Sequence, residues 1–265
     1  MALKIVVLAK QVIDPEMPSS AFRIDANGLR VAPPPNLAPV VNGFDEQAVE
    51  AALRIKEAVG DAHVTVLSAG ASFASDVIKK PLAMGADALV LVEDESLAYT
   101  HDPLPVVDTL AAAIGKLGRV DLLLAGRQAS DWDNAQVPIG LAETLGWPVV
   151  TLARAIEVTG EVARVERVLP DGHEVAEVLL PAVVTISNEL GNARYPNMRG
   201  IMNAKRIEAT RWRLADLEVT PRTGVLELLS LALPPQDRVT EMVTGENDAD
   251  AGRRLATRLR EEKLI

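Results

Sequence analysis

The sequence predicts a doubly wound α/β fold with a mainly parallel sheet and helices on both faces, followed by a small antiparallel β annex and an extended C-terminal tail. Short apolar runs alternate with amphipathic stretches as far as Trp147, and strand-like segments joined by tight turns follow that residue. Such alternation is typical of parallel sheets, whose central strands are buried on both faces and therefore consist of continuous apolar residues.

The apolar runs predict four parallel strands, at residues 3–9, 63–67, 88–92 and 120–125. Helices are expected between them. The stretch 45–59 places its apolar residues on one stripe, as the helical period requires. Residues 106–117 are rich in Ala and Leu, and residues 139–145 complete the set of predicted helices in this part of the chain.

The segment after Trp147 predicts antiparallel strands at residues 155–158, 162–168 and 175–179. Thr159-Gly160 and Pro170-Asp171-Gly172 supply the residue types that hairpin turns need. From Thr210 onward the chain is polar and weakly periodic, and it ends in a predicted helix at about residues 248–262. A tail of this kind often lies on a partner protein.

Composition narrows the possible functions. The 265 residues, 48% of them hydrophobic, can bury a substantial core, and no apolar run predicts a membrane span or a signal peptide, so a cytoplasmic protein is expected. Without cysteine, and with only three histidines, thiolate chemistry and iron–sulfur ligation are excluded and no metal site is expected. The net charge of -10 argues against nucleic-acid binding, which depends on cations that neutralise phosphates.

One turn at the expected ligand edge of the sheet is suited to an anion. In open α/β sheets, ligands bind beyond the carboxyl ends of the strands. Residues 126–136 follow such a strand, and Val137-Pro138 opens the next predicted helix, where proline is well tolerated. Backbone N–H groups of residues 134–137 would then face a phosphate at the helix N-terminus. The alternative is a solvated turn whose Asp and Asn residues only cap the helix.

Two further turns lie at the same predicted edge, at residues 42–45 and 68–71. Asn42 and Asp45 are also good helix caps, and Phe44 is equally suited to packing in the core. The sequence contains neither G-x-G-x-x-G nor G-x-x-x-x-G-K-[ST], so the usual motif support for a dinucleotide dehydrogenase or a P-loop nucleotidase is lacking. No catalytic cluster stands out, and the chain is not expected to be an enzyme.

Several strings, in order along residues 3–210, resemble the beta-subunit family of electron-transfer flavoproteins. They are AKQVID at 9–14, NGFD at 42–45, LAMGAD at 82–87, GRQA at 126–129 and LPAVVT at 180–185. The most specific string, NARYPNMRGIMNAK at 192–205, is similar to the signature loop of that family. The last fifty or so residues match the family only in general character.

The resemblance implies an electron carrier that works as a heterodimer. The alpha subunit would hold most of the electron-carrying FAD, and the beta subunit would hold AMP. Flavin dehydrogenases would reduce the FAD, and a quinone reductase or another acceptor would oxidise it. Phe44 and the stretch around Asp14-Pro15 would approach that FAD. The implied nucleotide-binding residues are Leu8, Ala9, Asn42, Gly43, Phe44, Asp45, Ala69, Gly126, Arg127, Gln128, Ala129, Ser130, Asp131, Trp132, Asp133, Asn134, Ala135, Gln136 and Val137.

The resemblance also implies a docking loop for dehydrogenases at about residues 190–203. Its expected contact residues are Arg194, Tyr195, Pro196, Met198, Ile201 and Met202, with Met198 as the anchor unless that side chain packs internally. On this interpretation residues 1–210 form the nucleotide-binding domain, including the β annex at about 149–190. Residues 211–265 form a tail and helix that pack on the alpha subunit.

Alternatives remain open. In some members of the family a second FAD replaces AMP and supports electron bifurcation. The string DNAQV at 133–137 resembles those members, whereas Gly146-Trp147-Pro148 resembles the AMP type, and AMP is preferred because that type is commoner. A universal-stress-type ATP-binding domain would share the sheet, but the β annex would be superfluous. A nicotinamide-dependent oxidoreductase that acts alone is the third interpretation.

Overall fold

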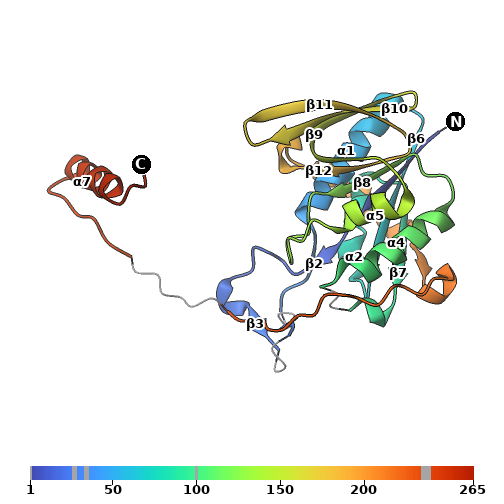
Figure 1. The fold of residues 1–265 in the computed structure, drawn as a ribbon, viewed down its shortest axis with the longest axis horizontal. Coiled ribbons are helices and arrows are strands. Elements are labelled where there is room, and N and C mark those ends of the chain that lie inside the picture. Colours follow the sequence, from blue (N-terminus) through green and yellow to red (C-terminus); the bar gives the residue numbers. More distant parts are fainter. Residues whose placement is uncertain (1, 26–28, 33–35, 99–100, 234–239) are drawn as a thin grey trace. The chain divides into compact units, whose positions relative to one another are not determined.

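The computed structural model describes residues 2–25, 29–32, 36–98, 101–233 and 240–265. The chain divides into two compact units, Met1–Leu231 and Ala232–Ile265. In the described part of the first unit, nine strands form one sheet in the order β11-β10-β9-β12-β8-β1-β6-β7-β13. Figure 1 shows β9, β10 and β11 together at one end of the unit. The predicted α/β fold with a mainly parallel sheet is therefore confirmed.

Parallel strands form the part of this sheet that runs from β12 to the edge strand β13. They are β1 (Leu3–Leu8), β6 (Ala62–Gly70), β7 (Ala88–Glu93), β8 (Leu122–Gly126), β12 (Ala182–Ile186) and β13 (Thr210–Trp212). β1 pairs with β6 on one side and with β8 on the other, in parallel in both cases. All residues of β8 are buried, which explains why a continuous apolar run predicted this strand. All residues of β12 are buried as well, although β12 was not predicted.

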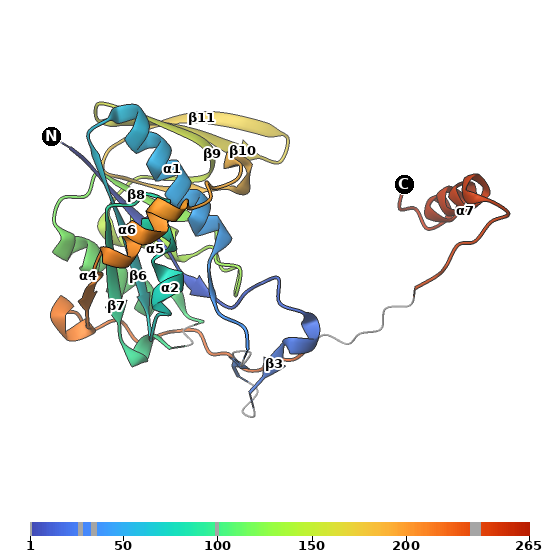
Figure 2. The ribbon, with the colours of Figure 1, turned by 180° about the vertical axis from the view of Figure 1, so that it is seen from behind.

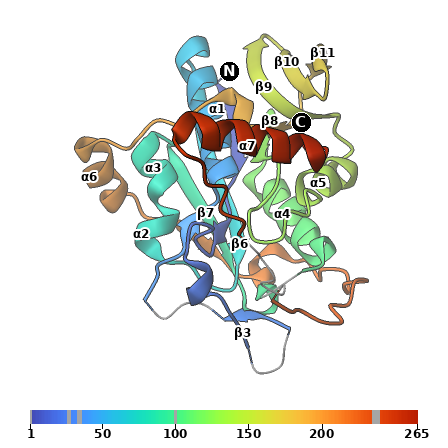
Figure 3. The same ribbon diagram turned by 90° about the vertical axis from the view of Figure 1, so that its left-hand side faces the viewer.

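Helices cover both faces of the sheet (Figure 3). One face carries α1 (Gly43–Val59), α2 (Ser75–Ile78), α3 (Lys80–Met84) and α6 (Met198–Arg206), and the other carries α4 (Pro103–Leu117) and α5 (Val137–Leu145). Alternate residues of β1 divide between the two cores, since Ile5 packs with the α1 side and Val6 with the α4 side. Burial on both faces is the main source of stability in such a sheet.

The predicted β annex consists of β9 (Val149–Thr159), β10 (Val162–Leu169) and β11 (Gly172–Leu179), which pair in antiparallel fashion. These strands do not form a separate sheet. β12, which the hydrophobic pattern had not singled out as a strand, lies between β8 and β9 and pairs in parallel with both. The annex therefore continues the central sheet, and β11 is its edge strand.

Several smaller features were not predicted. Two-stranded sheets join β2 (Gln11–Val12) to β5 (Val40–Val41) and β3 (Arg23–Ile24) to β4 (Val31–Ala32). Short 3-10 helices lie at Ser19–Ala21, Glu95–Leu97, Asn188–Leu190 and Leu214–Leu217. Residues 210–212, expected at the junction with the tail, form the edge strand β13, which pairs with β7. Pro81 lies in the first turn of α3, so it begins a new helix after α2 instead of breaking one.

The second unit contains α7 (Asp248–Glu261), which confirms the helix predicted there. Asn247 caps it, because its side chain accepts a hydrogen bond from the backbone N–H of Asp250 at 3.0 Å. No residue of α7 is buried in the described structure. Among the residues that the model describes, no helix is long and apolar enough to cross a membrane, and no group of acidic, His or Cys side chains could hold a metal ion.

Candidate functional site

The order of the strands reverses between β1 and β8. From β1 the chain adds β6 and β7 on one side, and it then returns to place β8 on the other side. The helix that follows β1 is α1, whereas α4 and α5 flank β8 on the opposite face. Such a switch point opens a crevice at the carboxyl ends of the strands, which is where open α/β sheets bind ligands. Ala9 and Gly126 lie at these two strand ends.

Asp45, at the start of α1, bonds to the backbone that follows β1 and to the last residue of β8. One carboxylate oxygen accepts the backbone N–H of Lys10 at 2.8 Å, and the other accepts the N–H of Gly126 at 3.1 Å. Burial raises the pKa of the Asp45 carboxyl to about 7, and the hydrogen bonds only partly offset this effect. A single side chain therefore ties the ends of β1 and β8 to α1.

Asn42 attaches the turn at residues 126–136 to the same helix. It occupies the N-cap position of α1, but its side chain makes no capping hydrogen bond. Its Nδ2 donates to the carbonyl of Gln128 at 2.8 Å, and its Oδ1 accepts the N–H of Ser130 at 3.2 Å. The side chain is fully buried. Of the two interpretations of Asn42, capping by the side chain is therefore not the one observed.

Gly126 is required by the close approach of the turn to α1. A Cβ at this position would lie 2.6 Å from the Asp45 carboxylate and 2.6 Å from both the carbonyl carbon and the Cβ of Phe44. The guanidinium of the next residue, Arg127, stacks over the Phe44 ring with 5.7 Å to the ring centroid. Phe44 thus packs against the turn, half-buried at the edge of the crevice.

The middle of the turn has an unusual backbone. Asp133 and Ala135 both have a φ of 53°, the left-handed region that residues other than Gly and Asn seldom adopt. The amide of Gln128 donates to the Asp133 carboxylate at 2.7 Å, and the N–H of Asp133 donates to the carbonyl of Ala129 at 2.9 Å. Strained backbone held by such contacts is typical of ligand-binding turns.

The turn leads into α5 with unused hydrogen-bond donors. Within the described chain, the backbone N–H groups of residues 134–137 have no acceptor. Two buried side-chain atoms of the turn also lack a partner among the described residues, namely Ser130 Oγ and Arg127 Nε. Buried polar atoms are normally hydrogen-bonded, so an unpaired set beside a helix N-terminus is the arrangement expected of a site that receives an anion.

The structure adds two residues that the sequence did not place in the site. Lys10 Nζ forms an ion pair with Asp131 at 2.7 Å, which brings a cation to the turn. The carbonyl of His101 accepts a hydrogen bond from Asn134 Nδ2 at 3.2 Å, and its ring lies 6.3 Å from that of Trp132. Lys10 could have been found from its position after the first strand. His101 has no sequence signal, because only the fold brings α4 beside the turn.

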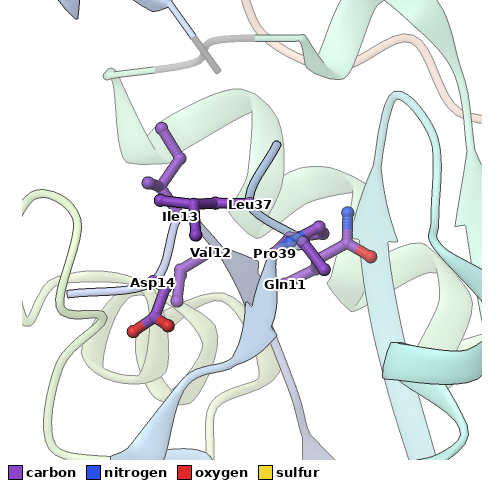
Figure 4. Close-up of a pocket in the computed structure, with 7 residues that line it drawn as sticks. Gln11, Val12, Ile13, Asp14, Leu37 and Pro39 are labelled. Carbon is purple, nitrogen blue, oxygen red and sulfur yellow. The ribbon is translucent and has the colours of Figure 1, made fainter. Parts of the chain in front are cut away.

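A cavity of about 200 Å³ is lined by residues 11–14 and 37–39. As Figure 4 shows, Ile13 lies beside Leu37 and Gln11 beside Pro39, whereas the Asp14 carboxylate points away. Gln11 is fixed because its Oε1 accepts the N–H of Ala74 at 2.8 Å. The cavity includes Asp14, which the resemblance placed near a flavin, but it is distinct from the anion-type turn at α5.

The remaining predicted residues divide by location. Leu8 is buried at the end of β1 and Ala69 is half-buried near the end of β6, both at the ligand edge of the sheet. Gly43 and Gln136 are exposed at the N-termini of α1 and α5. The docking-loop residues lie elsewhere, on α6 and the segment before it (Figure 2). The residues of the two predicted sites therefore lie in two separate areas of the structure.

Within the docking loop, exposure differs sharply between neighbours. Tyr195 is 90% exposed and Met198 is 73% exposed, so internal packing of Met198 is not observed. Met202 and Ile201 are also exposed, and Pro196 is half-buried. Arg194, by contrast, is bonded to Glu50 and Glu57 of α1. Half of the predicted loop is helical, because α6 begins at Met198, capped by Asn197.

A doubly wound sheet with a turn like that of residues 126–136 at its switch point is typical of α/β proteins that bind ligands beyond the carboxyl ends of their strands. The family model described as the electron transfer flavoprotein domain matches residues 37–217, so the chain belongs to that family. It is 35% identical to the caffeyl-CoA reductase-Etf complex subunit CarD of Acetobacterium woodii, over 99% of this chain and 100% of that protein.

The curated relatives also define the type of subunit. The chain is 35% identical to the electron transfer flavoprotein subunit beta of Thermoanaerobacterium thermosaccharolyticum, over 99% of this chain and 100% of that protein. Identity to the corresponding subunit of Megasphaera elsdenii is 39%, over 78% of this chain and 76% of that one. The protein is thus of the beta-subunit type, and the family predicted from the sequence is confirmed.

Proposed function

We propose that this beta subunit pairs with an electron-transfer flavoprotein alpha subunit and holds an adenine nucleotide at the turn between β8 and α5. The heterodimer carries electrons from flavin dehydrogenases to a quinone reductase or another acceptor, and its FAD, held mostly by the alpha subunit, supplies the redox chemistry. The observation that carries the nucleotide site is the set of unpaired donors at residues 134–137, together with the unpaired buried atoms of Ser130 and Arg127.

The nucleotide phosphate lies at the N-terminus of α5, where the helix dipole and free N–H groups favour negative charge in a chain with a net charge of -10. The proposed nucleotide is AMP, whose role is structural. A second FAD is the alternative, and the string at 133–137, which resembles that of members with two FAD molecules, favours it. Val137 has no hydroxyl to offer a single phosphate, whereas backbone N–H groups bind a monophosphate or a pyrophosphate equally well.

Nucleotide content tests both forms of the proposal. The heterodimer is denatured, and the released nucleotides are identified and counted by chromatography. One FAD and one AMP per heterodimer support AMP in the beta subunit, whereas two FAD and no AMP establish the alternative. A heterodimer that releases no nucleotide beyond the alpha-bound FAD contradicts the proposed site.

Ala135→Asp tests the location. Aspartate tolerates the left-handed backbone of this position better than alanine does, so the fold should persist. Its carboxylate would repel a phosphate at α5, and the nucleotide should be lost on dialysis. Thr159→Asp, in an exposed hairpin turn of the annex, is the matched control and should keep its nucleotide. If Ala135→Asp also keeps the nucleotide, the phosphate lies elsewhere.

The second part of the proposal is that the docking loop at residues 190–203 receives dehydrogenases, with Met198 as the anchor. A long, flexible and exposed apolar side chain can adapt to several partner pockets. Met198→Ala should reduce electron transfer from a dehydrogenase by about tenfold or more, because about 1.5–3 kcal/mol of anchor burial is lost. Val175→Ala, which shortens an exposed side chain on β11, should leave the transfer unchanged.

The third part concerns residues 211–265, which we propose pack on the alpha subunit. Val225, Leu229, Met242 and Ile265 are each more than 70% exposed, and α7 buries none of its residues. Exposed apolar side chains in such number are typical of a surface that a partner covers. Sedimentation of the beta subunit alone should therefore show association or instability. A stable monomer that melts at the same temperature as the heterodimer would contradict this part.

A further inference from the structure

One side of α1 carries a stripe of polar side chains that faces residues 190–194. Gln47, Glu50, Arg54 and Glu57 recur at helical spacing, so they lie above one another along the helix. Gln47 Nε2 donates to the carbonyl of Gly191 at 3.3 Å, and Arg54 Nη1 donates to the carbonyl of Leu190 at 3.2 Å. The stripe therefore holds the backbone just before the exposed part of the docking loop.

Glu50 is the centre of this stripe. Its side chain is 6% exposed, and one carboxylate oxygen accepts Arg54 Nε at 2.8 Å. The other accepts both Nε of Arg194 at 2.7 Å and the backbone N–H of Arg194 at 3.1 Å. Burial by itself raises the pKa of Glu50, but the hydrogen bonds from the two guanidinium groups outweigh it and leave the pKa below its usual value.

Arg194 joins Glu50 to the surface of the loop. Its guanidinium contacts Glu50 on one side and Glu57 on the other, with 3.1 Å between Nη2 and Glu57 Oε2. The planar fork of arginine makes such a double contact, which lysine cannot reproduce. Directly after Arg194 come the exposed Tyr195 and, three residues later, Met198. The orientation of Arg194 thus determines where these side chains leave the surface.

The far end of the exposed segment is fixed by packing. Gly200 of α6 lies so close to α3 that a Cβ would stand 2.2 Å from the carbonyl oxygen of Ala83. Asn197 caps α6 by accepting the N–H of Gly200 at 2.8 Å. The segment between Arg194 and Gly200 is therefore short and attached at both ends, although its own side chains project into solvent.

From these contacts we infer that Glu50 is a positioning residue for partner docking. By fixing both the backbone N–H and the guanidinium of Arg194, it holds Tyr195 and Met198 in one orientation before a dehydrogenase arrives. Ordering the segment in advance removes an entropic cost that binding would otherwise carry. The inference rests on the proposed function in one respect, namely that this loop receives the dehydrogenase.

Hydrogen–deuterium exchange of the purified heterodimer tests the positioning directly. Glu50→Gln keeps the shape of the side chain but removes its charge. The backbone amide of Arg194, which donates to Glu50, should then exchange about tenfold faster, which corresponds to about 1.4 kcal/mol of local stability. Glu46→Gln is the matched control, because Glu46 of the same helix pairs with Lys80 of α3 and not with the loop. Its loop amides should exchange as in the wild type.

Arg194→Lys provides a second variant if Glu50→Gln folds poorly. It retains the positive charge and loses the double contact, so the same backbone amide should exchange faster while the melting temperature changes little. In a Glu50→Gln/Arg194→Gln double-mutant cycle the two effects should be strongly non-additive. Unchanged exchange of the backbone amide at position 194 in both Glu50→Gln and Arg194→Lys overturns the inference.

Electron-transfer kinetics separate this inference from the proposed function. With a flavin dehydrogenase reduced by its substrate, Glu50→Gln should raise the KM for the heterodimer about tenfold and leave kcat and the flavin spectrum unchanged. If exchange rises in Glu50→Gln but neither Glu50→Gln nor Met198→Ala alters transfer, the positioning stands and docking at this loop is wrong. If Met198→Ala slows transfer while exchange in Glu50→Gln is unchanged, docking stands and the positioning role is wrong.

Discussion

Asp45 and Glu50 are both buried carboxylates of α1, but they meet different donors. Asp45 receives backbone N–H groups from the ends of β1 and β8, which are neutral dipoles. Glu50 receives two guanidinium groups, from Arg54 and Arg194. Burial dominates at the first and raises its pKa to about 7, whereas the charged donors dominate at the second and lower its pKa.

The difference shows how one helix serves two areas of the molecule. Near its N-terminus α1 holds the ends of β1 and β8 through Asp45, whose carboxyl group bonds to backbone N–H groups. Further along, it holds the docking loop through ion pairs that remain partly exposed, since the Arg54 and Arg194 side chains are 45% and 34% exposed. Four predictions test this contrast.

The largest expected effect is the pH dependence of stability from Asp45. Its folded pKa of about 7 lies above the ordinary value of 3.8, so between these values the folded chain holds the extra proton. Its contribution is therefore complete below pH 3.8 and is lost as pH rises through 7, by about 4 kcal/mol as an upper bound. Urea unfolding of the heterodimer at fixed concentration should show this loss, and Asp45→Asn should abolish it.

Asp76→Asn, at the exposed first turn of α2, is the control for Asp45→Asn and should retain the wild-type pH dependence. If wild type and Asp45→Asn lose stability equally between pH 5 and pH 8, Asp45 is already ionised in the folded protein, and the contrast with Glu50 disappears.

The next effect is steric. Gly126→Ala places a Cβ 2.6 Å from Asp45 and from Phe44 backbone, so either the turn or the start of α1 must shift. Overpacking of this kind should cost about 1–3 kcal/mol and weaken nucleotide retention. Thermal melting and nucleotide analysis of the heterodimer measure both. Gly115→Ala, in α4 with open space around its Cβ, should be neutral or stabilising.

The third effect is a contribution of Glu50 to stability that is lost on acidification, whereas that of Asp45 is lost as pH rises. Because the folded pKa of Glu50 is lowered, its contribution is present above the ordinary value of 4.5 and is lost as pH falls through the folded pKa. Glu50→Gln should therefore cost about 1–3 kcal/mol at pH 7 and much less in strong acid. A cost that stays constant with pH would mean that shape, and not charge, is what Glu50 supplies.

The smallest effect is expected at Glu57, the outer partner of Arg194. Its side chain is 62% exposed, so solvent screens the ion pair. Glu57→Gln should cost about 0.2–1 kcal/mol and change exchange in the docking loop only slightly. An effect as large as that of Glu50→Gln would show that burial does not distinguish the two carboxylates.

Most of the central fold could be predicted from the sequence. The four apolar runs became β1, β6, β7 and β8 with shifts of a few residues at their ends, and the predicted helices became α1, α4, α5 and α7. β12 and β13 were not recognised as strands. β13 has only three residues, and its pairing with β7 is what distinguishes it from coil. β12 is as long and as buried as β8, so its apolar run could have been recognised. The ladder through β12 also merged the predicted annex into the main sheet.

The site was predicted unevenly for the same reason. The turn at 126–137 was found because glycine, proline and polar residues follow a buried strand, and its Val137-Pro138 start of a helix is confirmed. Whether Asn42 caps α1 or holds the turn could not be decided locally, because its partners Gln128 and Ser130 lie more than 80 residues away in the chain. Arg194 stays predicted as a contact for partners, and its bond to Glu50 of α1 was not predicted.

The sequence by itself determined the periodicity, and with it the fold class, the family and the turn that faces the switch point. Periodicity depends on neighbouring residues, so it can be read without knowing which segments meet. Only the tertiary structure decided that Asp45 accepts hydrogen bonds from backbone N–H groups and that Glu50 accepts them from guanidinium groups. The reason is that Gly126 and Arg194 contact α1 from distant parts of the chain. The pKa values of Asp45 and Glu50 therefore depend on these tertiary contacts and on burial, and not on the residue type alone.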